Sequence, residues 1–457
     1  MKRVSHVALT FTLSLAACAG TAAPALGQAG ARPRTAQGAE KEQSGKGNVS
    51  ADAAKGSEAR ALYEEAAQYA QRKFDEFEQK QMPYDQLLEQ KTLQEQKDLA
   101  LQNAARLAAR APLRGTDIYY SGLLYSLAGK GEGALDSMRS FLADTEPASP
   151  DLKQRARAVV AQQAALLGLT EEAERVLAEY AKAEPRNVAD QHRMNLLLAS
   201  AYVKKKEFAR AAAPAAEAYA AALEYARTSD NPVQRDTTIF SAGSFYTNLL
   251  IKAGRRDEGI RVAQEMRARA VAIPSARLYG QATELVLRQG EPFGLPPEVA
   301  GLEPAASTEL TVAELIGQGS VKLSELRGKV VLLDFWATWC TFCVKTMPRL
   351  NALHEKYKDR GLVIIGLNEF EGEIQGRPAT RAQELEYFRQ FKRRLNVPYD
   401  FAVAADARND APYGVASLPT AVLLDRRGRV RFLTVGASEQ EAELMKKMIL
   451  KLLDEKP

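Results

Sequence analysis

The hydrophobic and polar positions of this chain change their period once, near residue 290. From Ala59 to about Gln289 apolar residues recur at three- and four-residue intervals, alanine is abundant and runs of β-branched residues are scarce. This is the period of amphipathic α-helices, so the pattern predicts an all-α region over residues 58–290. Residues 291–307 are rich in proline and glycine, and we interpret them as a linker.

Four pieces of the helical region share a short polar turn followed by a small residue that opens an amphipathic helix. They are LAGKGEGALDSM, LGLTEEAERVL, VKKKEFARAAA and KAGRRDEGIRVA, and their small residues are Ala134, Ala173, Ala209 and Gly259. Successive small residues are 39, 36 and 50 positions apart, which resembles a degenerate form of the repeat of about 34 residues that tetratricopeptide proteins show. We therefore predict a degenerate tetratricopeptide-like array of paired helices, with an unrelated helical bundle as the alternative. Such arrays present a concave surface that binds other polypeptides, so we expect protein partners for this region.

After the linker, the pattern changes to that of an α/β domain over residues 308–457. A polar, hairpin-like stretch precedes an almost continuous apolar run, KVVLLDF, which is typical of a buried strand. The turn DRRGR suits a hairpin between the last two strands. The predicted strands are 329–335, 362–368, about 399–406, 420–425 and 429–436, and the predicted helices are 341–358, about 381–395 and the segment from Ser438.

The first 27 residues have the pattern of a secretory signal. Lys2 and Arg3 precede an apolar stretch, Val7–Ala17, that is too short to span a bilayer. It ends in Leu-Ala-Ala-Cys, which resembles the lipobox of bacterial lipoproteins, where Cys18 would be lipidated. The alternative is cleavage after Gly27, which would discard Cys18. Residues 28–57 are nearly free of large apolar side chains and predict a flexible tether.

These features predict an extracytoplasmic protein on the periplasmic side, attached to a bacterial membrane by a lipid anchor. A soluble secreted or periplasmic protein is the alternative. The composition is that of an ordinary globular protein, with 46% hydrophobic and 26% charged residues and a net charge of +5. Because no basic face is concentrated in the sequence, we expect no nucleic-acid partner. No histidine stands near the later cysteines, so we expect no metal site.

Once Cys18 is lipidated or removed, the remaining cysteines are Cys340 and Cys343, in the stretch WATWCTFC. A disulfide that closes so short a loop constrains little of the unfolded chain, so the spacing favours redox chemistry over a structural staple. At the start of a helix, free backbone N–H groups and the helix dipole lower the pKa of a thiol. We therefore predict Cys340 as the exposed nucleophile and Cys343, one turn later, as the more buried resolving thiol.

The stretch VVLLDFWATWCTFC, followed by Pro348 and by YGVASLPT, resembles the thioredoxin superfamily. Within it, LSELRGKVVLLDFWATWC is similar to the TlpA-like and ResA-like extracytoplasmic thiol–disulfide oxidoreductases. The resemblance covers about residues 300–457 and implies a thioredoxin-like fold. It also implies an enzyme that reduces protein disulfides without a prosthetic cofactor. Its partners would be disulfide-containing client proteins and an upstream thiol protein that donates electrons.

The resemblance also implies roles for individual residues. Pro419 matches the cis-proline of the family, which lies beside the cysteine pair and, with Leu418, presents backbone to a bound client. Trp339 matches the aromatic residue that flanks the site, and its alternative role is partial burial at the surface. Asp334 matches the buried acid that relays the proton of the resolving cysteine. A hydrogen-bonded aspartate at the end of a strand, without catalytic function, is the alternative.

Three positions depart from the TlpA-like pattern. Thr346 stands where a glutamate is common, and Asp334 stands where an asparagine is common. We infer that the proton relay has shifted to Asp334, so that Asp334→Asn should slow the exchange of Cys343. The third departure is the pair Thr341-Phe342 between the cysteines, where proline is usual at the second position. It leaves the redox potential open and makes Phe342 a candidate contact for a client.

Two other functions are compatible with parts of the sequence. In one, the helical array is the working part of a protein-binding scaffold, and the thioredoxin-like domain is an appendage that does not cycle. In the other, the protein is a peroxiredoxin-like peroxidase. A peroxidase of that kind needs a lone peroxidatic cysteine in a different local context, which the close pair of Cys340 and Cys343 does not provide.

Overall fold

The computed structural model describes residues 58–291 and 294–456. The predicted signal sequence with Cys18 and the predicted tether 28–57 lie outside the described residues. The chain divides into two compact units, Met1–Asp190 and Gln191–Pro457, and each is described by itself.

The first unit is helical throughout its described part. Its helices pack on their neighbours in sequence, α4 on α5, α5 on α6 and α6 on α7. Ala134 and Ala173 are the fourth residues of α5 and α7, and both are buried. The helices are α1 (Glu58–Ala67), α2 (Tyr69–Gln79), α3 (Gln86–Ala108), α4 (Thr116–Leu127), α5 (Gly131–Ala143), α6 (Pro150–Leu166) and α7 (Thr170–Ala181).

The second unit holds five further helices, of which α8 begins three residues before the unit boundary. Within this unit α10 packs on α9 and α11, and α11 packs on α12. Gly259, the fourth residue of α11, is buried so closely that a Cβ atom there would lie 2.8 Å from the carbonyl oxygen of Thr247. Ala209 is the second residue of α9 and so lies in the first turn of a helix, as predicted, while the buried residue of that turn is Ala211. The helices are α8 (Val188–Lys204), α9 (Phe208–Thr228), α10 (Pro232–Lys252), α11 (Arg256–Ala272) and α12 (Ala276–Leu287).

The rest of the second unit is built on a six-stranded mixed sheet of thioredoxin-like fold, with the order β1-β6-β3-β2-β7-β8. β2, β3 and β6 are parallel to one another, whereas β1, β7 and β8 are antiparallel to their neighbours. A small separate hairpin, β4 with β5, follows β3. The strands are β1 (Glu314–Ile316), β2 (Val330–Phe335), β3 (Leu362–Glu369), β4 (Glu373–Ile374), β5 (Arg377–Pro378), β6 (Asp400–Ala404), β7 (Thr420–Leu424) and β8 (Val430–Val435).

The hairpin-like stretch expected before β2 is not a hairpin. Its only strand is β1, which pairs with β6 at the far edge of the sheet. The residues that follow β1 do not pair with a second strand. For example, the backbone N–H of Gly319 donates to the Asp400 carboxylate over 2.8 Å. Polar residues and glycines in this stretch therefore form a loop that runs back towards β2.

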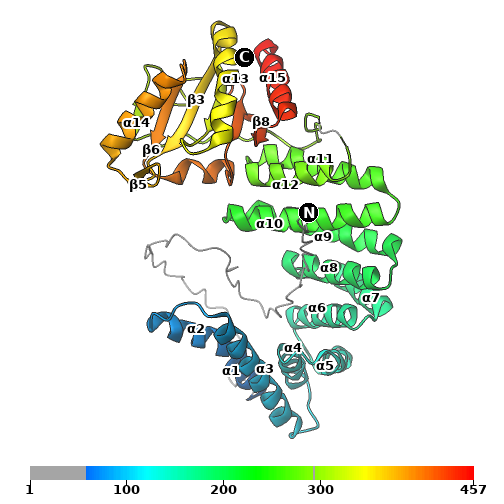
Figure 1. Cartoon of the computed structure of the whole chain (residues 1–457). Helices are drawn as coiled ribbons and strands as arrows, with labels where there is room; N and C mark the ends of the chain where they lie inside the picture. The colour runs from blue at the N-terminus through cyan, green and yellow to red at the C-terminus, as the bar shows by residue number, and fades with distance from the viewer. Residues whose placement is uncertain (1–57, 292–293, 457) are drawn as a thin grey trace, which may run out of the picture. The chain divides into compact units, whose positions relative to one another are not determined.

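All six residues of β2 are buried, as expected of a central strand covered on both faces. Three helices accompany the sheet: α13 (Thr341–Tyr357), α14 (Arg381–Arg394) and α15 (Glu439–Asp454). Figure 1 shows α13 and α15 beside the strands. Asp334 pairs with Gly366 on one side and Ala421 on the other. Phe335 pairs with Thr420, so the end of β2 lies next to the start of β7.

The helix α12 joins the helical layer to the sheet within the second unit. It contacts α10 and α11, and it also contacts β8 at the sheet edge. Its Tyr279 ring meets the Phe432 ring with centroids 6.0 Å apart. α12 is amphipathic: it buries Leu278 and Ala282 on one face, leaves Glu284 exposed on the other, and covers an edge strand that would otherwise expose its side. Within residues 58–291 and 294–456, no helix has the length and apolar character needed to cross a membrane.

Candidate active site

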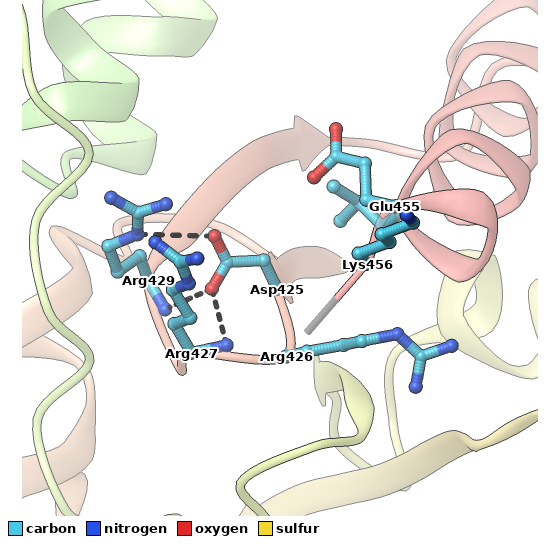
Figure 2. A pocket seen from close by; sticks show the side chains of 7 residues that line it. Asp425, Arg426, Arg427, Arg429, Glu455 and Lys456 are labelled. Carbon is cyan, nitrogen blue, oxygen red and sulfur yellow. Dashed lines mark hydrogen bonds and ion pairs between the residues drawn. The ribbon is translucent and has the colours of Figure 1, made fainter.

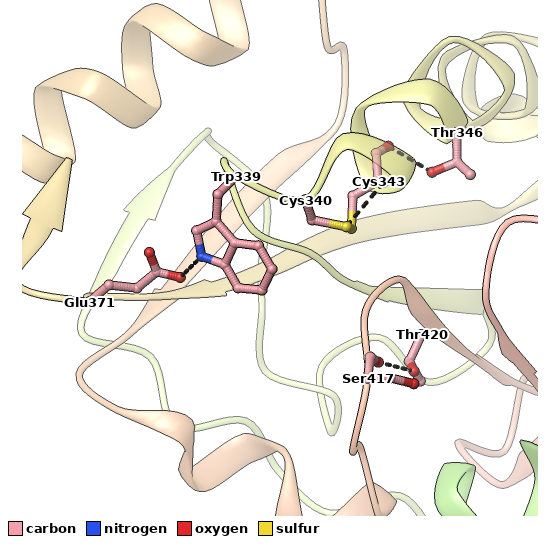
Figure 3. Close-up of a disulfide and its surroundings, with 7 residues drawn as sticks. All are labelled: Trp339, Cys340, Cys343, Thr346, Glu371, Ser417 and Thr420. Atoms are coloured by element: carbon pink, nitrogen blue, oxygen red, sulfur yellow. Dashed lines mark hydrogen bonds between the residues drawn. A yellow bond between two sulfur atoms is a disulfide. The ribbon is translucent and has the colours of Figure 1, made fainter. Parts of the chain in front are cut away.

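The two cysteines lie at the start of α13, directly after the central strand β2. Cys340 is the N-cap residue of α13 and forms a disulfide with Cys343, with the Cα atoms 5.2 Å apart (Figure 3). The backbone N–H of Cys343 donates a hydrogen bond to the Cys340 sulfur over 3.2 Å. The Cys340 sulfur therefore occupies the place where helix N–H groups stabilise negative charge, which favours its thiolate after reduction.

The two sulfurs differ in burial. Both are buried, with exposed fractions of 6% for Cys340 and 1% for Cys343, so the prediction of an exposed Cys340 is wrong for the disulfide form, and only the predicted order of exposure holds. A nucleophile has to meet a client before the resolving thiol acts, so this order of exposure is the one that the predicted roles require. The disulfide itself is the oxidised product that a dithiol leaves after it has reduced a client.

Asp334 is buried in the sheet behind the cysteine pair. Its exposed fraction is 3%, and its Oδ2 atom has no hydrogen-bond partner among the described residues. Burial away from water disfavours the charged carboxylate and raises the pKa of Asp334 to about 7. The unpartnered Oδ2 gives no support to the alternative, a hydrogen-bonded aspartate at the strand end. A free oxygen and a pKa near neutrality are properties of a group that exchanges protons.

A small cavity of about 60 Å³ is lined by Asp334 and by residues of α13 and of the Pro419 loop, but by neither cysteine. It lies between the sheet and the helices α13 and α15, and its lining includes Asp334, Thr346, Pro419 and Glu441. The Thr346 hydroxyl donates to the carbonyl oxygen of Cys343 over 2.8 Å, so the cavity reaches the turn that carries the resolving sulfur. A cavity of this size with carboxyl and hydroxyl groups in its lining has room for water, since one molecule needs about 10–15 Å³ measured with a water-sized probe.

The loop that contains Leu418 and Pro419 faces the disulfide. The peptide bond between these residues is cis, and Pro419 lines the same cavity as Asp334. Its carbonyl oxygen accepts a hydrogen bond of 2.8 Å from the Gly436 N–H, which fixes the loop to the strand end. Figure 3 shows Ser417 and Thr420 of this loop opposite the cysteines. The Leu418 side chain is half-buried against the core, so the backbone of Leu418 is the part suited to contact a client.

Two large aromatic side chains are exposed next to the cysteines. Trp339 is 64% exposed and Phe342 is 61% exposed, whereas Trp336 is buried in the core. The amine of Lys345 lies 5.6 Å from the centre of the Phe342 ring. Exposed aromatic surface beside a reactive group is typical of a site that binds a partner.

Sequence reasoning missed two acids that hold Trp339 in place. The Trp339 Nε1–H donates to Glu371 over 2.6 Å, as Figure 3 shows. Glu384 is 1% exposed and accepts hydrogen bonds from the N–H groups of Glu371 and Gly372 over 2.8 Å and 3.1 Å. Burial, together with the charge of Glu384, raises the pKa of Glu371. The sequence indicates that a segment is inserted after β3, but it does not indicate which side chains of that segment contact Trp339.

A larger cavity of about 300 Å³ lies away from these residues, at the turn between β7 and β8 (Figure 2). Because β7 runs antiparallel to β2, the end of β7 is at the side of the sheet opposite the cysteines. Asp425 pairs there with Arg429 at 3.2 Å and with Arg431 at 3.3 Å, and Arg431 also pairs with Glu455 at 2.9 Å. These ion pairs tie the hairpin to the end of α15, and none of the predicted site residues lines this cavity.

Comparison with known proteins places residues 303–433 in the AhpC/TSA family pattern. The thiol-disulfide oxidoreductase ResA of a Bacillus cereus strain is 33% identical over 130 residues, which are 28% of this chain and 68% of that protein. ResA of Bacillus thuringiensis subsp. konkukian is 33% identical over 139 residues, 30% of this chain and 73% of that protein. A solved thiol-disulfide isomerase from Corynebacterium glutamicum is 24% identical, with a TM-score of 0.28, over 33% of this chain and 96% of that one.

Proposed function

Because this chain belongs to the ResA family of thiol–disulfide oxidoreductases, we propose that it reduces disulfide bonds of client proteins outside the cytoplasm. The observation that carries the proposal is the position of the Cys340–Cys343 pair at the N-terminus of α13, in front of the buried acid Asp334. In this proposal residues 308–457 are the redox domain, residues 291–307 the linker and residues 58–290 a domain that recruits clients.

The reaction uses the two sulfurs in turn. The Cys340 thiolate attacks one sulfur of the client disulfide, forms a mixed disulfide and releases the other client sulfur as a thiolate. The Cys343 thiolate then attacks the Cys340 sulfur, which releases the second client thiolate and closes the Cys340–Cys343 disulfide. Two electrons have passed to the client. An upstream dithiol protein returns them by the same exchange in reverse, so no prosthetic cofactor is required.

Asp334 supplies the proton transfer that the second step needs. Cys343 is nearly fully buried, and burial in apolar surroundings favours the neutral thiol, which is a poor nucleophile. A carboxylate whose pKa is about 7 is ionised for part of the time at neutral pH and can accept the thiol proton. The cavity beside Asp334 and Thr346 offers room for water to carry that proton between the carboxylate and Cys343.

Client binding is assigned to the surface around the cysteines. The exposed rings of Trp339 and Phe342 supply apolar contact. The backbone of Leu418, set by the cis bond to Pro419, supplies hydrogen-bonding groups to an extended client segment. The helical region is proposed to bind proteins as well. The scaffold alternative, in which the helical array is the working part, predicts that the cysteines can be replaced without loss of function.

The proposed location rests on the sequence of the first residues. A basic start, a short apolar stretch and Leu-Ala-Ala-Cys18 support export and lipidation of Cys18, and the segment 28–57 supports a tether. Labelled fatty acid fed to expressing bacteria should therefore enter the protein, and Cys18→Ala should abolish the label. Absence of label from the unsubstituted protein would favour the soluble alternative, and label that persists in Cys18→Ala would show that another residue carries the lipid.

A trapping experiment tests the redox proposal. Cys343→Ser leaves the nucleophile without its resolving partner, so the reduced full chain should accumulate a mixed disulfide with insulin that dithiothreitol releases. Cys340→Ser is the matched control and should trap little, because the remaining sulfur is buried. Equal trapping by both variants would contradict the assigned order of attack. Absence of trapping and of insulin reduction by the unsubstituted chain would favour the scaffold alternative.

A further inference from the structure

The first turn of α12 contacts the loop that leads into Pro419. The backbone N–H of Arg277, in the first turn of the helix, donates to the carbonyl oxygen of Gly414 over 2.9 Å. The first N–H groups of a helix have no partner within the helix, so this one is available for a group outside it. Gly414 precedes the segment Val415–Pro419, which faces the disulfide at its far end. A helix of the all-α part therefore bonds to the loop assigned to client binding.

The contact is close at the level of the backbone. Gly414 has φ of +58°, and a Cβ atom there would lie 2.9 Å from both the Cα and the Oγ of Ser275 and 3.3 Å from the Ala276 nitrogen. Side chains rarely approach backbone so closely, so only glycine fits between this loop and the helix. The loop thus rests directly on the N-terminus of α12.

The N-terminus of α12 is itself held rigidly. Ser275 has an exposed fraction of 0%, and its hydroxyl accepts the Leu278 N–H over 3.1 Å as the N-cap of the helix. The same hydroxyl donates to Asp236 of α10 over 2.5 Å, and Asp236 is buried and paired with Arg235 at 2.9 Å. Buried polar groups that satisfy one another fix a local structure, so α10 and α12 form a firm support under Gly414.

A second contact reaches Pro419 from its other side. The Pro419 carbonyl oxygen bonds to the Gly436 N–H at the end of β8, and Val435 beside it packs against α12. A Cβ atom on Gly280 of α12 would lie 3.4 Å from the nearest Val435 side-chain carbon, which is ordinary van der Waals contact. Both the loop before Pro419 and the strand that holds its carbonyl group therefore lie against one helix.

We propose that α12 is a positioning element for client binding, in which the contact of Ser275 and Arg277 with Gly414 sets the Pro419 loop at its working distance from the cysteines. The inference rests on the proposed function, because it concerns how a protein client is held. An extended polypeptide must bond to the loop and meet the Cys340 sulfur at the same time. A small disulfide needs only the sulfur. The helical part of the second unit thus contributes to the reduction of proteins without touching the reacting atoms.

Two substitutions in the full chain test the contact from its two sides. Gly414→Ala adds the Cβ atom that Ser275 has no room for. Arg277→Pro removes the N–H donor, and proline in the first turn leaves the bonds of the helix itself intact. Gly301→Ala is the matched control, because Gly301 also has a positive φ, of +77°, but no atom lies within 4 Å of its Cβ position.

The pre-reduced proteins are mixed with insulin and, separately, with the small disulfide dithionitrobenzoate, and the two second-order rate constants are compared. We expect Gly414→Ala and Arg277→Pro to lower the insulin rate constant about tenfold, since misplacement of a bound reactant by about 1 Å can cost up to a hundredfold. The rate constant for dithionitrobenzoate, the reduction potential and the values for Gly301→Ala should stay within about twofold of the unsubstituted protein.

Unchanged insulin rates in both variants would overturn the inference. Equal losses with the two substrates would also overturn it, because they would report damage at the cysteines instead of a displaced loop. Failure of the proposed function gives a different result, because the unsubstituted chain itself would then not reduce insulin. Failure of the inference about α12 leaves insulin reduction by the unsubstituted chain intact.

Discussion

The indole Nε1–H of Trp339 donates a hydrogen bond of 2.6 Å to Glu371, a residue of the segment inserted between β3 and α14. The bond holds an aromatic ring that is 64% exposed in one orientation beside the disulfide. Burial raises the pKa of Glu371 above its ordinary value, and the carboxylate is a stronger acceptor than the neutral acid. The bond should therefore weaken as the pH falls through that raised pKa.

We expect the fluorescence of Trp339 to titrate with a midpoint above about 4.3, the ordinary value for glutamate. Glu371→Gln should remove the titration, while Glu373→Gln, a neighbour on the exposed side of the loop, should keep it. Trp339→Phe identifies the signal, because Trp336 is the other tryptophan. A titration that persists in Glu371→Gln would show that another group controls the ring.

Asp334→Asn should slow the resolving step. An amide cannot accept the proton of Cys343, so we expect release of the client from the mixed disulfide to fall about 10²-fold near pH 7, the lower end of what general base catalysis contributes. Stopped-flow measurement of that release in the full chain checks it. Thr434→Val, at a position that lines the same cavity without an acid, should react normally. If the client is released from Asp334→Asn as fast as from the unsubstituted protein, Asp334 does not relay the proton of Cys343.

The same aspartate should make stability depend on pH. In the unfolded chain Asp334 ionises near its ordinary pKa of 3.8, whereas in the folded protein it stays protonated up to about 7. The folded state therefore binds more protons between these values, and its stability falls as the pH rises from about 4 to about 7. The loss is complete above pH 7 and amounts to at most about 4 kcal/mol.

Asp334→Asn removes this dependence. From pH 4 to pH 8 the free energy of unfolding of the variant should gain about 2–4 kcal/mol relative to the unsubstituted protein. Urea denaturation of both oxidised proteins at the two pH values measures the difference. If the difference between the two proteins is the same at pH 4 and pH 8, the carboxyl group does not have the raised pKa that burial implies.

Phe342→Ser should weaken the binding of protein clients without affecting the reaction with small disulfides. The ring is 61% exposed, so its removal should change stability by less than about 0.5 kcal/mol. We expect a rise of several-fold in the KM for insulin with little change in the reaction of dithionitrobenzoate. Leu287→Ser is the control, because Leu287 is an exposed apolar side chain on a different helix, α12, and its replacement should leave both reactions unchanged. A fall in both reactions would place Phe342 in the chemistry of the sulfurs instead.

The elements of the redox domain, residues 308–457, could be predicted well because their sequences carry strong local signals. The run KVVLLDF is a short, almost continuous apolar stretch typical of a buried strand, and β2 spans Val330–Phe335. Ser438 was expected to open the last helix, and it is the N-cap of α15. The glycines and polar residues before β2 have the composition of a hairpin turn, but the backbone N–H of Gly319 bonds to the Asp400 side chain instead of to a paired strand.

The contacts between segments distant in the chain were beyond sequence reasoning. Nothing in the order of residues indicates that Glu371 bonds to Trp339 or that Ser275 lies under Gly414. Such pairs depend on how loops pack once the sheet is formed, which hydrophobic period and turn composition do not encode.

The reduction potential of the full chain tests the central claim most directly. The protein is equilibrated in defined thiol–disulfide buffers, and the Cys340–Cys343 pair is followed by thiol alkylation. A reductase fed by a dithiol donor should show a reversible two-electron transition below the range of about −180 to −230 mV covered by disulfide isomerase and glutaredoxins. A potential clearly above that range would make the protein an oxidant or an isomerase, and a pair that does not cycle would contradict the account altogether.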